Sequence, residues 1–472
     1  MVRVSRRQLL AGVGAGALGI SRWVPGGAPR VAIVGGGLAG LTCAYRLAQR
    51  GIASALYDAR ERVGGRCFTA RGFSDGQVAE HGGEFIDSAH LEIRALAREL
   101  GVGLEDRYAA EAGGVEYDWV AGRRRRAGLL DHALGPVISR LVGEAARVGD
   151  YSWRGANRRA RELDEMTAQE WLDGNVDGGI GAPSARLMAA SLTSEFGLDA
   201  DRLSALSLVD LYAGATAESD ERYHVRGGND QLAALLARGH ARVELGAPLI
   251  GLRRLARGYE LRFHGLSARR AEVVVLALPF TALRRVDLSG AGLSARKLRC
   301  IAELGMGTNA KLLVQLRVRP EALGGWSGES VQDEPELVVW ESTRAQRGAG
   351  SVLTLYTGGR AGASYRVSVP HARAPSAVVE RAFGQLDRVV PGARQAWNGH
   401  AFLDSWVDDR WARGSYAAFL PGQLTRYWGF VGRSDGDVHF AGEHTSTRSQ
   451  GFLNGAVESG ERAAREVARK LA

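Results

Sequence analysis

Short apolar runs followed by glycine-rich turns occur near both ends of the chain and in its middle. Four of them predict buried strands: residues 31–34, 54–58, 272–279 and 438–440. A strand that is covered on both faces reads as a continuous apolar run, as these do. After the first run, apolar and small residues recur with helical spacing from Leu41 to Ala48. A buried strand, a glycine turn and a helix in this order predict a βαβ unit of a parallel α/β sheet.

The rest of the chain changes between helical and strand-like patterns. Thr167 and Glu170 have the spacing of a capping box, in which each residue satisfies a backbone N–H at the start of a helix. Helical spacing over residues 184–196 and 203–214 predicts a mostly helical insertion. Five further strands are predicted at residues 249–253, 259–264, 310–320, 336–343 and 351–358. The last three suit a sheet that lines a substrate cavity.

Length, composition and charge indicate the number of domains and the kind of partner. The chain has 472 residues, 45% of them hydrophobic, which is enough for two or more domains of roughly 100 to 200 residues each. Its net charge is +9, but 52 acidic residues are interspersed with the basic ones. The densest basic cluster, residues 123–126, is predicted to be a solvated hairpin tip. No aromatic interleaving or binding motif accompanies it, so we expect no nucleic-acid partner.

The three cysteines, Cys43, Cys67 and Cys300, have neither metal-ligand spacing nor the density of a disulfide scaffold. We therefore expect no structural metal and no disulfide framework. Two of them lie in or beside the glycine-rich turns, where a small buried residue is the simpler role.

Residues 1–28 precede the first predicted strand and resemble a twin-arginine export signal. Arg6 and Arg7 stand before a short run rich in glycine and alanine, with Ser5 in front and Leu9 and Leu10 behind. The run is shorter than the roughly 20 apolar residues of a membrane span, so we expect no stable membrane insertion. We predict export by the twin-arginine route, to the periplasm or as a secreted protein. The alternative is an unstructured basic tail on a cytoplasmic protein.

The first glycine turn has the spacing of a dinucleotide-binding motif. Gly35, Gly37 and Gly40 permit a tight turn, close approach of the backbone to a pyrophosphate, and close packing of helix on strand. The helix N-terminus then presents N–H groups to the phosphate. Asp58 ends the next predicted strand, where a carboxylate binds the ribose hydroxyls.

Further glycine turns favour a cofactor larger than NAD. Arg62, Gly64, Gly65 and Arg66 form a second turn that carries cations, and residues 80–90 form a third. Near the C-terminus, the sequence FAGEHTS is followed by a helix predicted to begin near residue 451, whose N-terminus carries partial positive charge. These turns suit a flavin dinucleotide, because a reduced flavin gains negative charge at its pyrimidine edge.

Lys311 lies in the apolar, strand-like run at residues 310–320. The chain contains 61 Lys and Arg residues together, and only positions 297, 311 and 470 are Lys. Burying an ammonium group is costly unless it has a partner, so this lysine points to a polar cavity or a functional site. The alternative is a strand position that faces solvent.

Taken together, these segments resemble the flavin-containing amine oxidase family, which includes monoamine, polyamine and L-amino acid oxidases. The motifs that carry the resemblance run from residue 30 to the C-terminus: VAIVGGGLAG, DARERVGGR, GGEFI, RGGNDQLAALLA, AEVVVLALP, MGTNAKLL, GSYAAFLPGQ, FAGEHTS and GFLNGAVESG. The resemblance implies an α/β fold with a Rossmann-like FAD-binding domain of the GR2 type, assembled from discontinuous segments, and an α+β substrate-binding domain.

The resemblance also implies domain limits. The FAD-binding segments are residues 29–89, 222–288 and 430–472. The substrate-domain segments are residues 90–221, mostly helical, and 289–429, a sheet with helices. A homodimer is one assembly that the family allows.

For the chemistry, the resemblance implies a hydride transfer from the amine-bearing carbon to flavin N5, giving an imine that water hydrolyses. O2 then reoxidises the flavin and H2O2 is released. Lys311 matches the lysine that holds a water near N5, while Tyr416 and Phe452 match the two aromatic residues that flank the flavin face. Ser415 stands where some monoamine oxidases attach the flavin to a cysteine, so we expect non-covalent FAD.

The motifs imply a set of cofactor-binding residues: Gly35, Gly37, Gly40, Asp58, Arg60, Gly64, Gly65, Arg66, Gly82, Gly83, Glu84, Phe85, Trp406, Gly442, Glu443, Gly451 and Phe452. Asp87 is a carboxylate suited to a cationic amine substrate, and Glu84 and Glu195 are looser candidates, although structural ion pairing explains each of them about equally well. Phe85 replaces the arginine that often binds the substrate carboxylate in L-amino acid oxidases. The alternatives are an L-amino acid oxidase, a biosynthetic enzyme that desaturates a carbon–nitrogen bond, and a non-catalytic flavoprotein scaffold.

Overall fold

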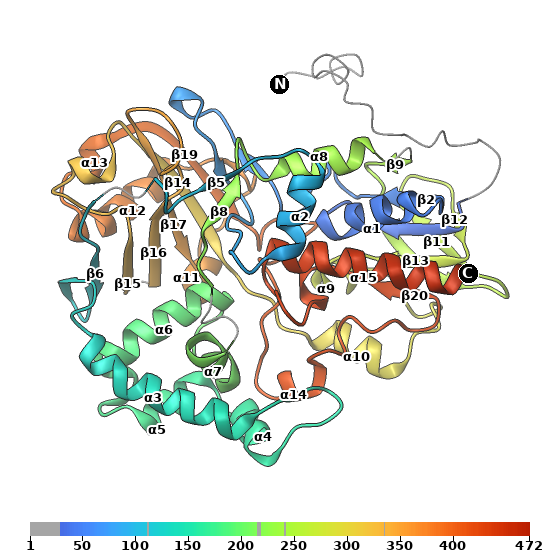
Figure 1. The fold of residues 1–472 in the computed structure, drawn as a ribbon, viewed down its shortest axis with the longest axis horizontal. Helices are drawn as coiled ribbons and strands as arrows, with labels where there is room; N and C mark the ends of the chain where they lie inside the picture. Colours follow the sequence, from blue (N-terminus) through green and yellow to red (C-terminus); the bar gives the residue numbers. More distant parts are fainter. Residues whose placement is uncertain (1–28, 111–112, 215–218, 240–241, 335) are drawn as a thin grey trace.

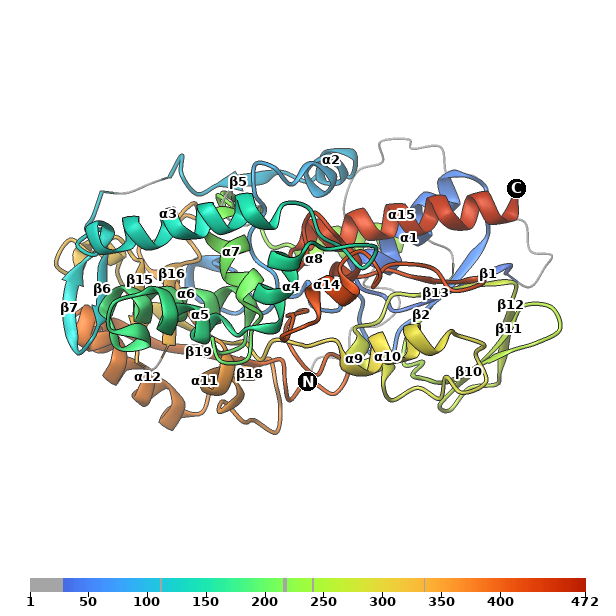
Figure 2. The ribbon, with the colours of Figure 1, turned by 90° about the horizontal axis from the view of Figure 1, so that it is seen from below.

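The protein folds into two lobes, seen side by side in the computed structural model (Figures 1 and 2). The structure describes residues 29–110, 113–214, 219–239, 242–334 and 336–472. The paired arginines of the export motif, Arg6 and Arg7, lie outside these residues. The lobe on the right in Figure 1 contains the C-terminus, and the lobe on the left contains the second sheet.

The right-hand lobe is built on a parallel sheet of five strands, in the order β20–β13–β1–β2–β9. In chain order, the strands are β1 (Val31–Val34), β2 (Ser54–Tyr57), β9 (Val243–Glu244), β13 (Val273–Leu276) and β20 (Val438–Phe440). Three distant parts of the chain therefore supply one sheet. The prediction of an α/β fold with a flavin domain of discontinuous segments is confirmed.

Helices cover one face of this sheet: α1 (Leu38–Gln49), α2 (Leu91–Glu99), α8 (Asp230–Arg238) and α15 (Leu453–Leu471). α1 and α15 lie side by side in Figures 1 and 2. A Cβ at Gly460 of α15 would lie 2.3 Å from the Ala39 carbonyl oxygen, so the small residues of α15 allow this close approach. α2 falls in the segment predicted for the substrate domain, but its buried Ile93, Leu96 and Ala97 pack into the core of the right-hand lobe.

The other face carries a three-stranded antiparallel sheet: β10 (Leu249–Arg254), β11 (Tyr259–Phe263) and β12 (Arg269–Ala271). The rings of Tyr57 and Phe263 lie 4.6 Å apart across this interface. The parallel sheet is thus buried on both sides, as its continuous apolar strands predicted.

The left-hand lobe contains an eight-stranded sheet in the order β18–β19–β14–β17–β16–β15–β6–β7. Its strands are β6 (Tyr117–Val120), β7 (Arg123–Arg126), β14 (Ala310–Leu316), β15 (Ser330–Asp333), β16 (Glu336–Glu341), β17 (Ser351–Thr357), β18 (Ala372–Arg373) and β19 (Trp397–Ser405). α12 (Ser376–Val389) and α13 (Ala393–Ala396) pack on one face.

The arginine run differs from its prediction. Residues 123–126 form the edge strand β7 rather than the hairpin tip, which lies at Ala121 and Gly122, both with positive φ. The substrate segment 90–221 therefore contributes β6 and β7 to this sheet besides its helices. Charged side chains on an edge strand oppose pairing with another chain.

The helical part of this lobe lies below the second sheet in Figure 1. Its helices are α3 (Asp131–Val148), α4 (Arg158–Glu165), α5 (Ala168–Asn175), α6 (Pro183–Phe196) and α7 (Ala205–Ala213). The capping box of Thr167 and Glu170 begins α5, as predicted. α6 packs beside β15 and β16, so the helical part and the sheet enclose a common space.

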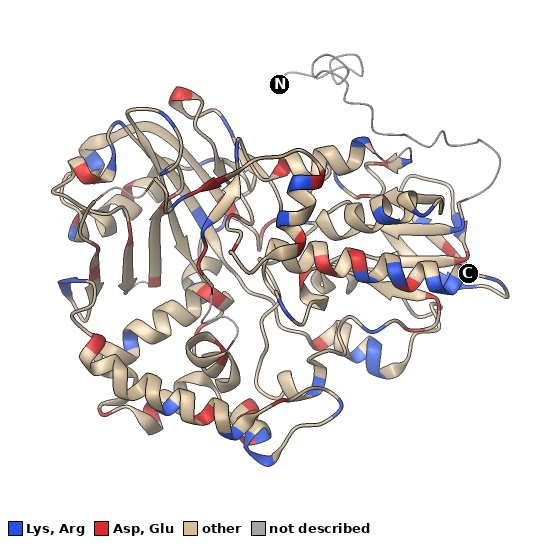
Figure 3. Ribbon diagram, viewed as in Figure 1, with Lys and Arg blue, Asp and Glu red and all other residues tan. Residues whose placement is uncertain are grey.

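The shorter elements are β3 (Thr69–Ala70), β4 (Ala79–Glu80), β5 (Leu104–Asp106), β8 (Tyr223–Val225), α9 (Phe280–Leu283), α10 (Ala295–Glu303), α11 (Gly359–Ala363) and α14 (Leu424–Tyr427). Acidic and basic residues are mixed over most elements (Figure 3). Among the helices of the described residues, none is both long and apolar enough to span a bilayer.

Candidate active site

A cavity of about 1310 Å³ lies between the two lobes. A single small-molecule site usually occupies about 300–1,000 Å³, so this cavity has room for a dinucleotide together with a substrate. All the predicted cofactor, catalytic and substrate residues lie on its wall except Gly40. Gly40 is instead a packing residue, because a Cβ there would come within 1.9 Å of the Gly35 carbonyl oxygen.

One end of the cavity is formed by the first two glycine turns. The Gly64 N–H donates to the Gly36 carbonyl oxygen at 2.8 Å, which joins the two turns. Asp58 accepts from the Gly36 N–H at 2.6 Å and from the Arg60 N–H at 2.7 Å. Burial raises the pKa of Asp58 above its ordinary value, although these hydrogen bonds oppose the rise. The carboxylate is thus held at the end of β2, beside the cavity.

Arginine–carboxylate pairs join remote segments around the cofactor cradle. The Arg60 guanidinium donates to both carboxylate oxygens of Asp409, at 2.7 and 2.8 Å. Arg66 donates to the Ser415 carbonyl oxygen at 2.6 Å and to Glu443 at 3.0 Å. The other oxygen of Glu443 accepts from the Gly451 N–H at 3.0 Å, next to the N-terminus of α15. Each motif therefore depends on another for its position.

Behind Trp406, two imidazoles flank one buried carboxylate. His81 Nδ1 and His371 Nδ1 lie 2.7 and 2.8 Å from Asp404 Oδ1. Ligands around a tetrahedral zinc ion are separated by roughly 3.3 Å, given bonds of about 2.0 Å. Both distances are shorter than this. The His371 contact is a hydrogen bond, whereas His81 Nδ1 has no hydrogen-bond partner of suitable geometry among the described residues. The ring of His371 packs against that of Trp406, 4.2 Å away.

Lys311 is the second residue of β14 and is only 5% exposed. Its Nζ donates to Glu84 Oε2 at 2.8 Å, to the Gly82 carbonyl oxygen at 2.8 Å and to the Glu80 carbonyl oxygen at 3.2 Å. Burial alone would raise the pKa of Glu84, but the charge and hydrogen bond of Lys311 outweigh it and the pKa is lowered. The prediction that this lysine is buried at a polar site is confirmed, and Glu84 is its ionic partner.

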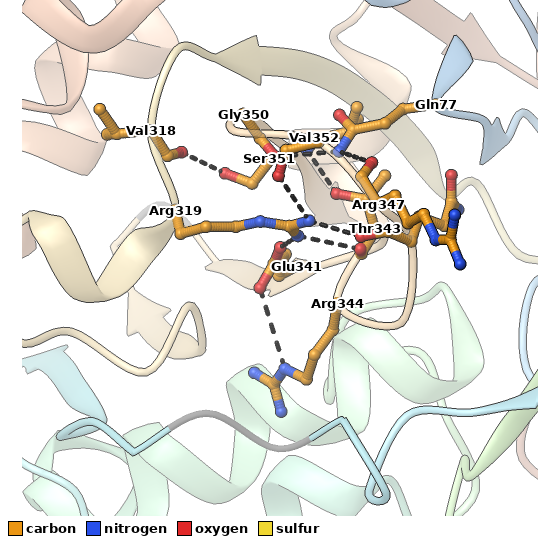
Figure 4. A network of polar contacts seen from close by, with 12 residues as sticks. Gln77, Val318, Arg319, Glu341, Thr343, Arg344, Arg347, Gly350, Ser351 and Val352 are labelled. Atoms are coloured by element: carbon orange, nitrogen blue, oxygen red, sulfur yellow. Dashed lines mark hydrogen bonds and ion pairs between the residues drawn. The ribbon is translucent and has the colours of Figure 1, made fainter. Parts of the chain in front are cut away.

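Trp340 on β16 completes the surroundings of Glu84. Its indole Nε1 donates to Glu84 Oε1 at 3.0 Å. The next residue, Glu341, is 1% exposed and accepts from Arg319 Nη1 at 2.6 Å. Figure 4 shows Arg319 also reaching the carbonyl oxygen of Thr343, 3.0 Å away. Neighbouring residues of β16 thus have different roles: Trp340 binds Glu84 at the cavity, and Glu341 pairs with Arg319, which holds the strand in place.

The aromatic residues form a connected wall. The hydroxyl groups of Tyr356 and Tyr416 are 2.9 Å apart, and Tyr416 donates to the Ser194 carbonyl oxygen at 3.0 Å. Since Tyr416 uses its proton there, Tyr356 donates to Tyr416. Phe452 lines the same cavity, with its ring 4.9 Å from that of His90. Sequence reasoning missed Tyr356 and Trp340, because their placement follows from strand register: Tyr356 is paired directly with Lys311.

The acidic candidates occupy different positions. Asp87 accepts from Ser219 Oγ at 2.7 Å and from the Glu221 N–H at 3.0 Å, so its carboxylate is held by its own surroundings. Glu195 projects from α6, and burial, reinforced by Asp87 and Asp210, raises its pKa to about 7. Glu221 was not predicted. Burial and the charge of Glu195 raise its pKa to about 8.

An arginine occupies the cavity beside Phe85. The Arg107 guanidinium carbon lies 4.4 Å from the centre of the Phe85 ring. Arg107 is 4% exposed and donates to the Glu221 carbonyl oxygen at 3.0 Å and to Glu329 at 3.2 Å. No local pattern predicts this arrangement, because Arg107 lies in the turn after β5, far from the glycine motifs.

A glycine-cradled parallel sheet, together with a second sheet that closes a large cavity, defines a dinucleotide-dependent oxidoreductase. The family model described as flavin containing amine oxidoreductase matches residues 38–468, and the chain belongs to this family. Amine oxidase [flavin-containing] A of Sus scrofa is 24% identical over 460 residues, covering 93% of this chain and 85% of the relative.

Two solved structures share the fold. Wild-type putrescine oxidase bound to putrescine superposes with a TM-score of 0.81 at 24% identity, covering 94% of this chain and 99% of that chain. Cyclohexylamine oxidase from Brevibacterium oxydans IH-35A superposes with a TM-score of 0.83 at 22% identity, covering 94% and 100%. The protein is thus an oxidoreductase for FAD-dependent amine oxidation.

The residues around the cavity fit FAD. The turn at Gly64 approaches Gly36 closely, and a Cβ at Gly82 would meet the Arg66 carbonyl oxygen at 1.7 Å. A residue larger than glycine at position 82 would therefore displace the backbone that lines the cavity. The guanidinium of Arg66 and the N-terminus of α15 supply positive charge beside the cavity, which suits a pyrophosphate and a reduced flavin.

Proposed function

We propose that the protein oxidises a small amine that arrives as a cation, at the part of the cavity bounded by Lys311, Tyr416 and Phe452. FAD supplies the hydride acceptor. The observation that carries this proposal is that these three side chains lie on the wall of the same cavity as the cofactor cradle. Tyr416, fixed by Tyr356, orients the amine, and the apolar ring of Phe452 excludes water from the opposite side.

We also propose roles for the charged residues. Lys311 fixes the polar edge of the site through hydrogen bonds to Glu84 and to the carbonyl oxygens of Gly82 and Glu80, which use all three of its N–H donors and leave none for a water. Asp87 and Glu195 attract the cationic amine. Non-covalent FAD is supported by Ser415, whose hydroxyl donates to Asn309 Oδ1 at 2.6 Å and has no thiol to offer the flavin. O2 as the electron acceptor with release of H2O2, export by the twin-arginine route and a homodimer complete the proposal.

The experiment is an anaerobic titration that follows loss of the flavin absorbance with a panel of amines. Bleaching by cationic amines, followed on admission of air by recovery of the absorbance and formation of H2O2, supports the proposal. A flavin that no amine bleaches, but that dithionite reduces, would refute it and favour a scaffold. Release of the yellow cofactor on acid precipitation tests the non-covalent attachment.

Amino acid oxidation is a second candidate, which Arg107 favours. Its guanidinium stacks on Phe85 in the cavity, and its Nε has no hydrogen-bond partner among the described residues. A substrate carboxylate is the partner that such a group lacks. Including L-amino acids beside their decarboxylated amines in the panel separates the two candidates, because only the first group would lose activity in Arg107→Gln.

A further inference from the structure

Glu195 and Glu221 present carboxyl groups to the cavity without hydrogen-bond or ion-pair partners within the described residues. Most buried carboxyl groups have such partners. Asp87 is held by Ser219, and Glu84 is held by Lys311. These two glutamates are therefore available to a ligand.

The backbone of Glu221 is held in a conformation that side chains rarely adopt. Its φ is 42°, in the left-handed region. Its N–H donates to Asp87 Oδ1 at 3.0 Å and its carbonyl oxygen accepts from Arg107 Nη1 at 3.0 Å. Both peptide groups are thus fixed, which maintains the strain and directs the side chain. Strain of this kind is concentrated at functional sites.

The charged groups around Glu195 and Glu221 do not neutralise the charge that these two carboxyl groups carry when ionised. Asp87 and Asp210 act on Glu195, while Glu195, Asp87 and Glu84 act on Glu221. Arg107 is the cation that opposes them at Glu221, and it already donates to Glu329. Tyr356 and Tyr416 face the same carboxyl groups and stay neutral, because burial raises the pKa of each.

We propose that Glu221 is a specificity-determining residue, which forms with Glu195 a receptor for a second cationic group of the substrate and releases protons when a dication binds. The inference rests on the proposed function, since it assigns a substrate class, the diamines, to the same cavity. In the absence of a cation, Glu195 is about half protonated at pH 7 and Glu221 is mostly protonated, because their pKa values are about 7 and 8. A bound ammonium group favours the ionised pair and expels the protons.

The test is isothermal titration calorimetry of the FAD-loaded protein with 1,4-diguanidinobutane, a dication, and with butylguanidine, the matching monocation. Titration in buffers of different ionisation enthalpy gives the number of protons released. At pH 7, the carboxyl group of Glu195 is about half protonated and that of Glu221 is about nine-tenths protonated. We therefore expect the dication to release about 1.4 protons. At pH 9 the number falls below about 0.2, and the dication gains at least about tenfold in affinity over the monocation between pH 6.5 and 8.5.

Variants assign the effect to the pair. Glu221→Gln should remove most of the proton release at pH 8, and Glu195→Gln should reduce it at pH 7. Glu116→Gln is the matched control, because Glu116 lines the same cavity and burial, reinforced by Asp118, raises its pKa to about 7 as well. It should leave the proton count unchanged. Flavin content and circular dichroism establish that each variant is folded.

Equal proton release in wild type and both single variants would overturn the inference, as would a dication that binds no more tightly than the monocation at pH 8.5. Neither outcome depends on turnover, because the guanidinium probes are not substrates for amine oxidation. Failure of the proposed function would appear instead as a flavin that no amine bleaches, so the two failures are distinguishable.

Discussion

Removing the ammonium group of Lys311 is the most direct perturbation of the site, and the structure predicts that it acts first on stability. Lys311→Met leaves the Glu84 carboxylate buried, with Trp340 as its remaining hydrogen-bond donor. Breaking a buried ion pair by deleting one partner costs about 3–5 kcal/mol. The carbonyl oxygens of Glu80 and Gly82 also lose their donor, which contributes part of this cost.

Neutralising the partner as well should recover most of the loss. In the double variant Glu84→Gln with Lys311→Met, no charge remains buried at this position. The remaining cost is that of the lost carbonyl hydrogen bonds, about 1–2 kcal/mol. The double variant should therefore be about 2–3 kcal/mol more stable than Lys311→Met alone.

The assay is urea unfolding of the FAD-saturated proteins, with flavin absorbance recorded for each. A double variant that is no more stable than Lys311→Met would refute the reasoning, because the cost could then not come from the unpaired Glu84 carboxylate. If the recovery is observed, kinetic effects of the lysine should be measured in the double variant. There, loss of activity is separated from loss of the fold.

Three further predictions concern other parts of the molecule. Gly40→Ala should yield protein without flavin absorbance, since its Cβ would clash with backbone, whereas Gly143→Ala in α3 meets only a distant side-chain atom and should bind FAD normally. Lys297→Met tests a buried ammonium group whose pKa burial lowers from 10.5 to about 8. The unfolded chain binds more protons between these pH values, so wild type should gain about 3 kcal/mol relative to the variant as pH rises from 8 to 10.5, and a constant difference in urea unfolding would contradict this. Tyr356→Phe should lower kcat about fivefold with little change in flavin content, because Tyr416 loses one hydrogen bond of about 1 kcal/mol. Equal kcat values for wild type and variant, checked by stopped-flow bleaching of the flavin, would show that Tyr356 does not contribute to catalysis.

Much of the fold could be predicted because its signals are local. The four apolar runs became strands β1, β2, β13 and β20, and the capping box of Thr167 and Glu170 begins α5 where the sequence placed it. Each signal depends on a few consecutive residues: buried strands need continuous apolar side chains, and a helix start needs an acceptor for its free N–H groups. The packing role of Gly40, which differs from the role of Gly35 and Gly37, also follows from its place as the third glycine of the turn.

The rest of the site depends on pairings between distant residues. Glu84 and Lys311 are 227 positions apart, and Tyr356 reaches the site because β17 pairs with β14 in one register. A shift of one residue in that register would turn Tyr356 to the other face of the sheet. The position of α2 and the strained backbone of Glu221 are likewise set by packing partners from other segments. No local pattern contains this information.

The geometry of Lys311 explains why a chain with so many arginines has a lysine here. Its three acceptors, Glu84 Oε2 and the carbonyl oxygens of Gly82 and Glu80, come from one loop that wraps around a single nitrogen. An ammonium group has three rotatable donors on one compact atom, whereas a guanidinium spreads five donors over a planar fork suited to bidentate partners. Because the lysine charge is matched by Glu84, Lys311 adds little net positive charge to the cavity that Glu195 and Glu221 line. The net charge of +9 on the whole chain acts mostly from beyond a Debye length of about 8 Å, so a basic protein can still offer an acidic cavity to a cationic amine.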